Sequence, residues 1–168
     1  MACNYYYSLN AVPPNAQVVD KEWVAANGGI DPDTATPAEL ATAGFYCYVQ
    51  VAPPTYDSKL YSVSFTWAIV GTNASENWSI DDLPLATAKE NCNRYVKGAA
   101  EEECQGIASN YNYGPYLVTA AAALAVASRP AELQVIISEM EIALNALQDK
   151  LIDINNATTV AQLAAIIA

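Results

Sequence analysis

The sequence contains no histidine, and its 7 Lys and Arg face 18 Asp and Glu, which gives a formal net charge of −11. Histidine is the commonest general base near neutral pH and the commonest metal ligand, so its absence removes the usual form of both chemistries. Binding to nucleic acid or to an anionic membrane needs clustered cations that neutralise phosphates. The composition therefore argues against a nucleic-acid partner and against histidine-dependent catalysis.

Other features are missing as well. No apolar run reaches the roughly 20 residues of a membrane-spanning helix, because the alanine-rich stretch 120–127 is too short. The first residues show no basic segment followed by an apolar one, so we expect no secretory signal. The four cysteines contain no Cys-x-x-Cys pair, which argues against a structural zinc site. The sequence thus predicts no membrane insertion, no metal and no cofactor.

The remaining chemistry is equally sparse. Cys104 follows Glu101 to Glu103, whose negative charge disfavours a thiolate nucleophile. The acidic groups Asp31 to Asp33 and Asp81 to Asp82 lack the alternating ligands and closing Glu of a calcium loop. We interpret them as turn and capping residues, and we predict that the chain is not an enzyme.

The first half of the chain carries strand patterns. Residues 4–10 and Phe45 to Val51 read as short strands, and Tyr61 to Val70 alternates most regularly. A turn at 71–74 and a returning strand over Asn77 to Ile80 predict a hairpin. We therefore expect residues 1–82 to form a small antiparallel β-rich module with one face buried, and Phe65 and Trp67 in its core.

One short helix interrupts this pattern. Thr36 is a capping residue, Pro37 suits the first helical position, and Glu39 stands three residues after the cap. Gly44 is expected to end the helix.

From residue 83 onward the apolar period changes from two to 3.6. Leu85, Ala88 and Cys92 begin one helical stripe that continues through Tyr95, Val96 and Ala99. An alanine-rich helix over 117–128, a long helix over 130–155 and a short final helix capped by Thr158 or Thr159 follow. The prediction is an α+β chain, with a β-rich module over 1–82 and a helical module over 83–168.

The long helix carries a heptad-like seam, with apolar residues spaced by four and three. The seam consists of Leu133, Ile137, Met140, Leu144, Leu147, Leu151 and Ile154. Val135, Ile136, Ile142 and Ile152 lie off the seam, so more than one face is apolar. Two interpretations remain open: a core helix of an intramolecular bundle, or an assembly helix that bundles with copies of itself.

A tyrosine-rich segment precedes the alanine-rich helix. Tyr111, Tyr113 and Tyr116 lie in a predicted loop, where exposed tyrosines suit a subunit contact. The same rings could stack on sugars, which would make the chain a carbohydrate-binding module.

Three stretches resemble one protein family when they are taken together. Thr36 to Tyr46 (TPAELATAGFY), Ala52 to Asp57 (APPTYD) and Trp78 to Lys89 (WSIDDLPLATAK) resemble segments of small tail-fibre-associated proteins of bacteriophages. The ending, from Leu144 to Val160, is also similar to C-terminal helices of phage tail proteins. The chain departs from that pattern at Cys47, where such proteins often carry proline, and in its tyrosine-rich loop.

The resemblance implies a structural component of a phage tail, in the tail fibre or attached to the baseplate. It places the chain in the virion after synthesis in the host cytoplasm, with other tail or baseplate proteins as partners. Together with the seam it implies self-association, as a trimer. The alternatives are a tail-fibre assembly chaperone and, from another class, an adhesin that binds host-surface glycans.

The cysteines can be assigned roles within this interpretation. Cys92 and Cys104 are twelve residues apart on one predicted helix, about 18 Å, so they cannot pair there. Cys47 suits a buried thiol in a strand, whereas Cys3 lies in an accessible tail. We hypothesise that one or more of Cys3, Cys92 and Cys104, Cys3 first, forms an intermolecular disulfide after the particle leaves the reducing cytosol. The alternative is that all four are free thiols.

Overall fold

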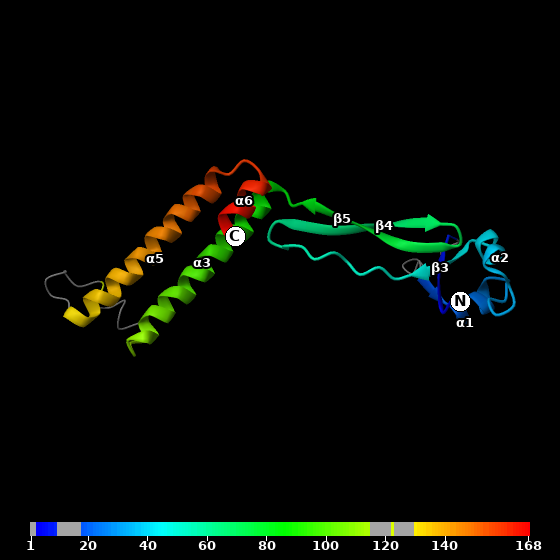
Figure 1. Cartoon of the computed structure of the whole chain (residues 1–168), viewed down its shortest axis with the longest axis horizontal. Helices are drawn as coiled ribbons and strands as arrows, with labels where there is room; N and C mark the ends of the chain where they lie inside the picture. Colours follow the sequence, from blue (N-terminus) through cyan, green and yellow to red (C-terminus); the bar gives the residue numbers. More distant parts are fainter. Residues whose placement is uncertain (1–2, 10–17, 115–121, 123–129) are drawn as a thin grey trace. The chain divides into compact units, whose positions relative to one another are not determined.

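The computed structural model describes residues 3–9, 18–114, 122 and 130–168 (Figure 1). Within these ranges the chain combines a five-stranded sheet with five helices, which confirms the α+β class. It divides into two compact units. The first consists of Met1–Tyr56 and Val63–Asp81, and the second of Asp57–Ser62 and Asp82–Ala168.

The sheet of the first unit has the strand order β2-β1-β3-β5-β4. Its strands are β1 (Tyr5–Ser8), β2 (Val18–Asp20), β3 (Phe45–Val49), β4 (Tyr61–Val70) and β5 (Asn73–Asp82). β1 is antiparallel to both β2 and β3, but β3 and β5 are parallel. The expectation of an antiparallel sheet is therefore wrong at this pair. The second strand of the hairpin, not the first, lies beside β3, and it runs in the same direction.

Two short helices close one side of this sheet. α1 (Lys21–Asn27) is capped by Asp20, whose carboxylate accepts from the Trp23 amide at 2.8 Å. The buried core of the unit joins both helices to the sheet. It consists of Tyr6, Val19, Val24, Leu40 and Phe45.

α2 (Pro37–Thr42) begins as the sequence predicts. The Glu39 amide donates to Thr36 Oγ1 at 3.3 Å, and the Thr36 amide donates to Glu39 Oε2 at 2.8 Å, which forms a capping box. Gly44 adopts a φ of 88°, a conformation that favours glycine, and the chain turns there into β3. This junction fixes the start of the central strand.

The predicted hairpin is present, and it is longer than expected in its second strand. Gly71 and Thr72 form a two-residue loop between β4 and β5, and Gly71 has the positive φ of 61° that a type II′ turn needs. Phe65 is 44% exposed and Trp67 is only partly buried, so the prediction of Phe65 in the core is wrong. The buried core lies on the opposite face of the sheet, under α1 and α2.

The second unit is built on an antiparallel helix pair, α3 (Leu85–Asn110) and α5 (Ala131–Asn156). One apolar cluster joins Ala88 of α3 to Ile154 near the end of α5, and a second joins Ala108 to Leu133. The first cluster also includes Leu60 from the segment that precedes β4. These contacts make α3 the partner of α5 within the chain (Figure 1).

α6 (Val160–Ile167) completes the first of these clusters with Val160 and Leu163. Thr159 caps it, as the sequence allows, in a capping box with Gln162. None of the helices in the described residues is long and apolar enough to span a membrane.

The buried stripe of α3 differs from the predicted one. Ala88, Cys92, Val96, Ala100 and Ala108 are buried, whereas Tyr95 and Ala99 are exposed. The buried residues are four apart, and residues at this spacing move slowly around the helix axis. After Val96 the buried stripe therefore lies to one side of the predicted stripe. Its small side chains allow α5 to approach closely.

Candidate assembly surfaces

Most of the predicted seam faces α3 of the same chain. Leu133, Ile137 and Met140 belong to the cluster around Ala108. Leu147, Leu151 and Ile154 belong to the cluster around Ala88 and Cys92. Leu144 is the exception, with 50% of its surface exposed. Leu144 is therefore the one seam residue available to a second chain without opening the helix pair.

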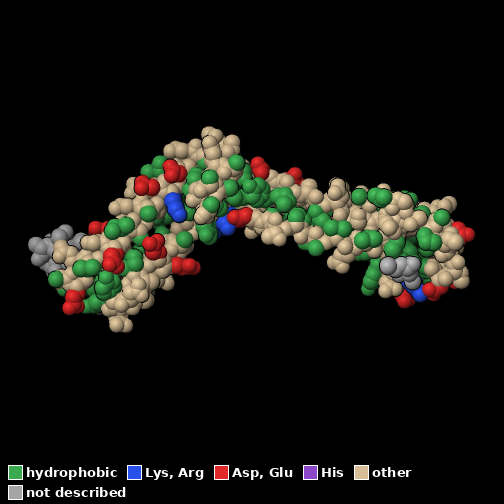
Figure 2. Space-filling model, in the orientation of Figure 1, with side chains coloured by type: hydrophobic (Ala, Val, Ile, Leu, Met, Phe, Trp, Pro, Cys, Tyr) green, Lys and Arg blue, Asp and Glu red, His purple; other side chains and the backbone are tan. Residues whose placement is uncertain are grey.

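Other apolar residues of α5 are exposed as well. Val135, Ile142 and Ile152 are 51%, 70% and 49% exposed. Acidic side chains surround them, and Figure 2 shows red carboxylates scattered over this unit with few blue cations. A contact between two copies on this face would bring like charges together.

The tyrosine-rich loop lies against the first half of α5. Tyr111 Oη donates to Glu139 Oε1 at 2.8 Å, and Tyr113 Oη donates to Glu132 Oε2 at 2.9 Å. These carboxylates raise the pKa of both tyrosines, because each phenol proton is held in a hydrogen bond. An open hollow of about 530 Å³ lies here, and it is lined by Tyr111, Asn112, Tyr113, Glu132 and Val135. Tyr116 lies outside the described residues.

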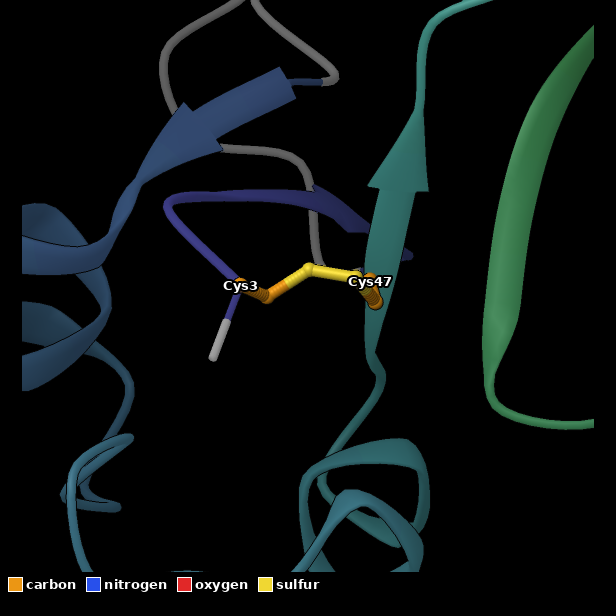
Figure 3. Close-up of a disulfide and its surroundings, with 2 residues drawn as sticks. All are labelled: Cys3 and Cys47. Atoms are coloured by element: carbon orange, nitrogen blue, oxygen red, sulfur yellow. A yellow bond between two sulfur atoms is a disulfide. The ribbon is translucent and has the colours of Figure 1, made fainter. Parts of the chain in front are cut away.

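Cys3 and Cys47 form a disulfide within the chain (Figure 3). Their Cα atoms are 5.8 Å apart, and 44 residues separate them in sequence. The bond replaces the intermolecular disulfide predicted for Cys3 and the buried thiol predicted for Cys47. It holds the start of the chain beside the middle of β3, where Tyr6 of β1 pairs with Cys47.

Cys92 and Cys104 are free thiols. Burial raises the pKa of Cys92, and the charge of Asp57 adds to that shift. Burial also raises the pKa of Cys104, with a further contribution from Glu103. Both environments disfavour the thiolate. Cys92 is fully buried on the α5 side of α3, which leaves Cys104 as the accessible one of the two.

Sequence reasoning missed an aromatic row across the sheet. The ring of Trp67 lies 4.5 Å from that of Tyr7, 5.8 Å from that of Tyr48 and 5.5 Å from that of Phe65. Phe65 continues the row to Trp78 at 4.9 Å. The row joins four strands on the face opposite the buried core. The alternation of each strand shows that these aromatic residues share a face of that strand, but it does not show that rings from different strands contact one another.

A carboxylate anchors this row to the segment after β3. Glu76 accepts from the Tyr48 hydroxyl and, at 3.0 Å, from the Val51 amide. Burial opposes ionisation of Glu76, but these hydrogen bonds outweigh it and lower its pKa. Trp78 Nε1 donates to the Val51 carbonyl at 2.9 Å. The segment after β3 is thus tied to β5 by side chains instead of by strand pairing.

A cavity of about 850 Å³ lies beside the disulfide in the first unit. Its lining includes Cys3, Tyr5, Asp33, Tyr48 and Asn73. Asp33 is paired with Lys21, so the lining offers no unpaired charge at that position. Among the described residues, no three His, Cys, Asp or Glu side chains are grouped as metal ligands.

Comparison with known proteins adds no relative, since no family model, no curated protein and no solved structure matches the chain.

Proposed function

We propose that the chain is a structural component of a bacteriophage tail, a tail-fibre or baseplate-attached subunit. The observation that carries the proposal is the resemblance of three stretches, in order and spacing, to small tail-fibre-associated proteins. In this proposal the chain is structural and not catalytic. The missing histidine and the raised pKa values of both free thiols are consistent with that role.

The positions of the three stretches support the proposal. The first covers α2, the Gly44 turn and the start of β3. The second is the segment after β3, and the third leads from β5 into α3. These are the junctions where the chain passes from one helix or strand to the next.

We further propose that the helical unit self-associates through helix 130–155 as a trimer. Leu144 is the seam residue that a second chain can reach. Leu144→Asp should therefore weaken association without opening the α3–α5 pair, since a buried charge at the contact is costly. Asn145→Asp is the matched control, because it adds the same charge at the next, exposed position.

Light scattering after size exclusion measures this effect. We expect a trimer for the unchanged protein and for Asn145→Asp, and a smaller species for Leu144→Asp. A monomeric unchanged protein at micromolar concentration would contradict self-association.

Mass spectrometry of purified particles tests the main proposal. A structural component stays with the particle through gradient purification, at a constant ratio to the other tail proteins. Presence in the infected-cell lysate but absence from particles would contradict the proposal and favour the assembly chaperone.

A further inference from the structure

The hairpin formed by β4 and β5 extends beyond the rest of the sheet in the first unit. β5 pairs with β3 only at Asn73 to Ser75, although β5 continues to Asp82. Beyond Ser75 the described strands leave β4 and β5 as a two-stranded ribbon. Glu76 and Trp78 tie the β5 side to Val51, but they do so through side chains. Two-stranded ribbons are marginally stable in water and gain stability from a third strand.

The composition of β4 is unusual for the last strand of a sheet. Its ten residues contain no charge and no proline, and most are β-branched or aromatic. Proteins normally protect such an edge with lysine, proline or a very short strand. Here Phe65, Ile69 and Val70 are 44%, 42% and 76% exposed instead.

Charge decides what can pair with this edge. The chain has a net charge of −11, so two copies repel each other wherever their carboxylates approach. β5 carries Glu76, Asp81 and Asp82, and the exposed face of α5 is acidic. Residues 60–75, by contrast, contain no ionisable carboxylate or cation. At the β4 edge, therefore, two copies can meet without bringing negative charges together.

We propose that β4 pairs with β4 of a second copy of this chain, antiparallel and about a two-fold axis. The result is a four-stranded ribbon in the order β5-β4-β4-β5, in which each β4 of about 34 Å gains a neighbour. In this antiparallel arrangement Phe65 of each copy lies opposite Ile69 of the other. The contact is distinct from the α5 seam and does not depend on the phage assignment.

Hydrogen–deuterium exchange tests the pairing directly on the unchanged protein. Amides of residues 61–70 should exchange more slowly at high than at low micromolar concentration, because pairing protects the outer edge of β4. Amides of α3 and α5 near the apolar clusters serve as the internal reference. Equal exchange of 61–70 at both concentrations overturns the proposal.

A charge-matched pair of variants separates this contact from others. Phe65→Lys with Ile69→Lys places two cations on β4, whereas Val135→Lys with Ile142→Lys places two on exposed α5 positions outside the seam. Circular dichroism first confirms that both variants fold. Sedimentation velocity should then show that only the β4 variant loses the doubling of mass at high concentration, together with the protection of 61–70. Equal loss in both variants, or loss in neither, overturns the proposal, whether or not the chain is found in particles.

Discussion

The two units of this chain solve the problem of stability differently. The first relies on strands as short as four and three residues, in β1 and β2, and on a disulfide that ties Cys3 to β3. The second relies on two helices of 26 residues each, joined by apolar clusters at both ends. The difference shows that the same chain uses a covalent bond where the buried core is small and apolar packing where it is large.

The size of the cores explains this division. Among the described residues, five buried and five partly buried residues form the core of the first unit, whereas eight of each form the larger cluster of the second. A small unit buries too little surface to offset its conformational entropy, and a disulfide compensates by restricting the unfolded chain. The helix pair needs no such bond, and its two thiols stay free.

The largest effect should come from the helical core. Ile154→Ala removes a side chain with 0% exposure and should cost about 2–5 kcal/mol of unfolding free energy. Ile152→Ala, two residues earlier and 49% exposed, should change it by about 0.5 kcal/mol. Urea denaturation followed by circular dichroism compares them. Equal losses would mean that the helix pair is not held by these clusters.

Loss of the disulfide should come next. Cys3→Ser with Cys47→Ser should cost the first unit about 2–4 kcal/mol, because the unfolded chain regains the freedom that the crosslink removes. Cys104→Ser is the control, since Cys104 is a free thiol in the second unit. Tryptophan fluorescence reports on the first unit, which contains Trp23, Trp67 and Trp78. A fluorescence midpoint equal to that of the control would contradict a stabilising role for this bond.

Matched helix caps offer a smaller and symmetrical comparison. Thr36 caps α2 and Thr159 caps α6, each in a capping box. Thr36→Ala and Thr159→Ala should each cost about 1 kcal/mol. Fluorescence should detect the first and helical circular dichroism the second. A loss that spreads to both probes in either variant would show that the units unfold together.

The smallest effect concerns pH. Hydrogen bonds from the Thr36 amide, and then from its hydroxyl, lower the pKa of Glu39, whereas the equivalent residue in α6 is Gln162 and does not titrate. The stability that the ionised Glu39 adds to the folded state is complete above the ordinary glutamate pKa of about 4.3. It disappears as the pH falls through the lower pKa that Glu39 has in the folded state. Acidification should therefore reduce the difference in unfolding free energy between Thr36→Ala and the unchanged protein, because the hydroxyl of Thr36 then loses its carboxylate partner. The hydrogen bond from the Glu39 amide to Thr36 Oγ1 does not titrate and keeps the rest of that difference. The Thr159→Ala difference should not change, and a parallel decrease would contradict this assignment.

Local signals were the predictable part of the fold. Thr36, Pro37 and Glu39 identified α2, and Gly71 with the alternation of β4 identified the hairpin. The seam of α5 was visible, and so was Thr159 as a cap. These features depend on neighbours within a few residues, so sequence spacing carries them.

Long-range pairings could not be predicted in the same way. Cys3 pairs with Cys47 because β1, which follows Cys3, lies beside β3. The spacing of apolar residues within a strand does not show which strands are neighbours. The parallel pairing of β3 with β5 has the same origin. Phe65 alternates like a core residue, yet the helices cover the other face of the sheet. The partner of the α5 seam was left open for this reason too, since spacing shows an apolar face but not what covers it.

Hydrogen–deuterium exchange with and without reductant tests the contrast between the units most directly. We predict that reduction speeds exchange in β1, β2 and β3, because the Cys3–Cys47 bond holds these short strands together. Exchange in α3 and α5 should stay unchanged, since no disulfide lies among their described residues. Unchanged exchange in the three strands, or faster exchange in both units, would contradict the account.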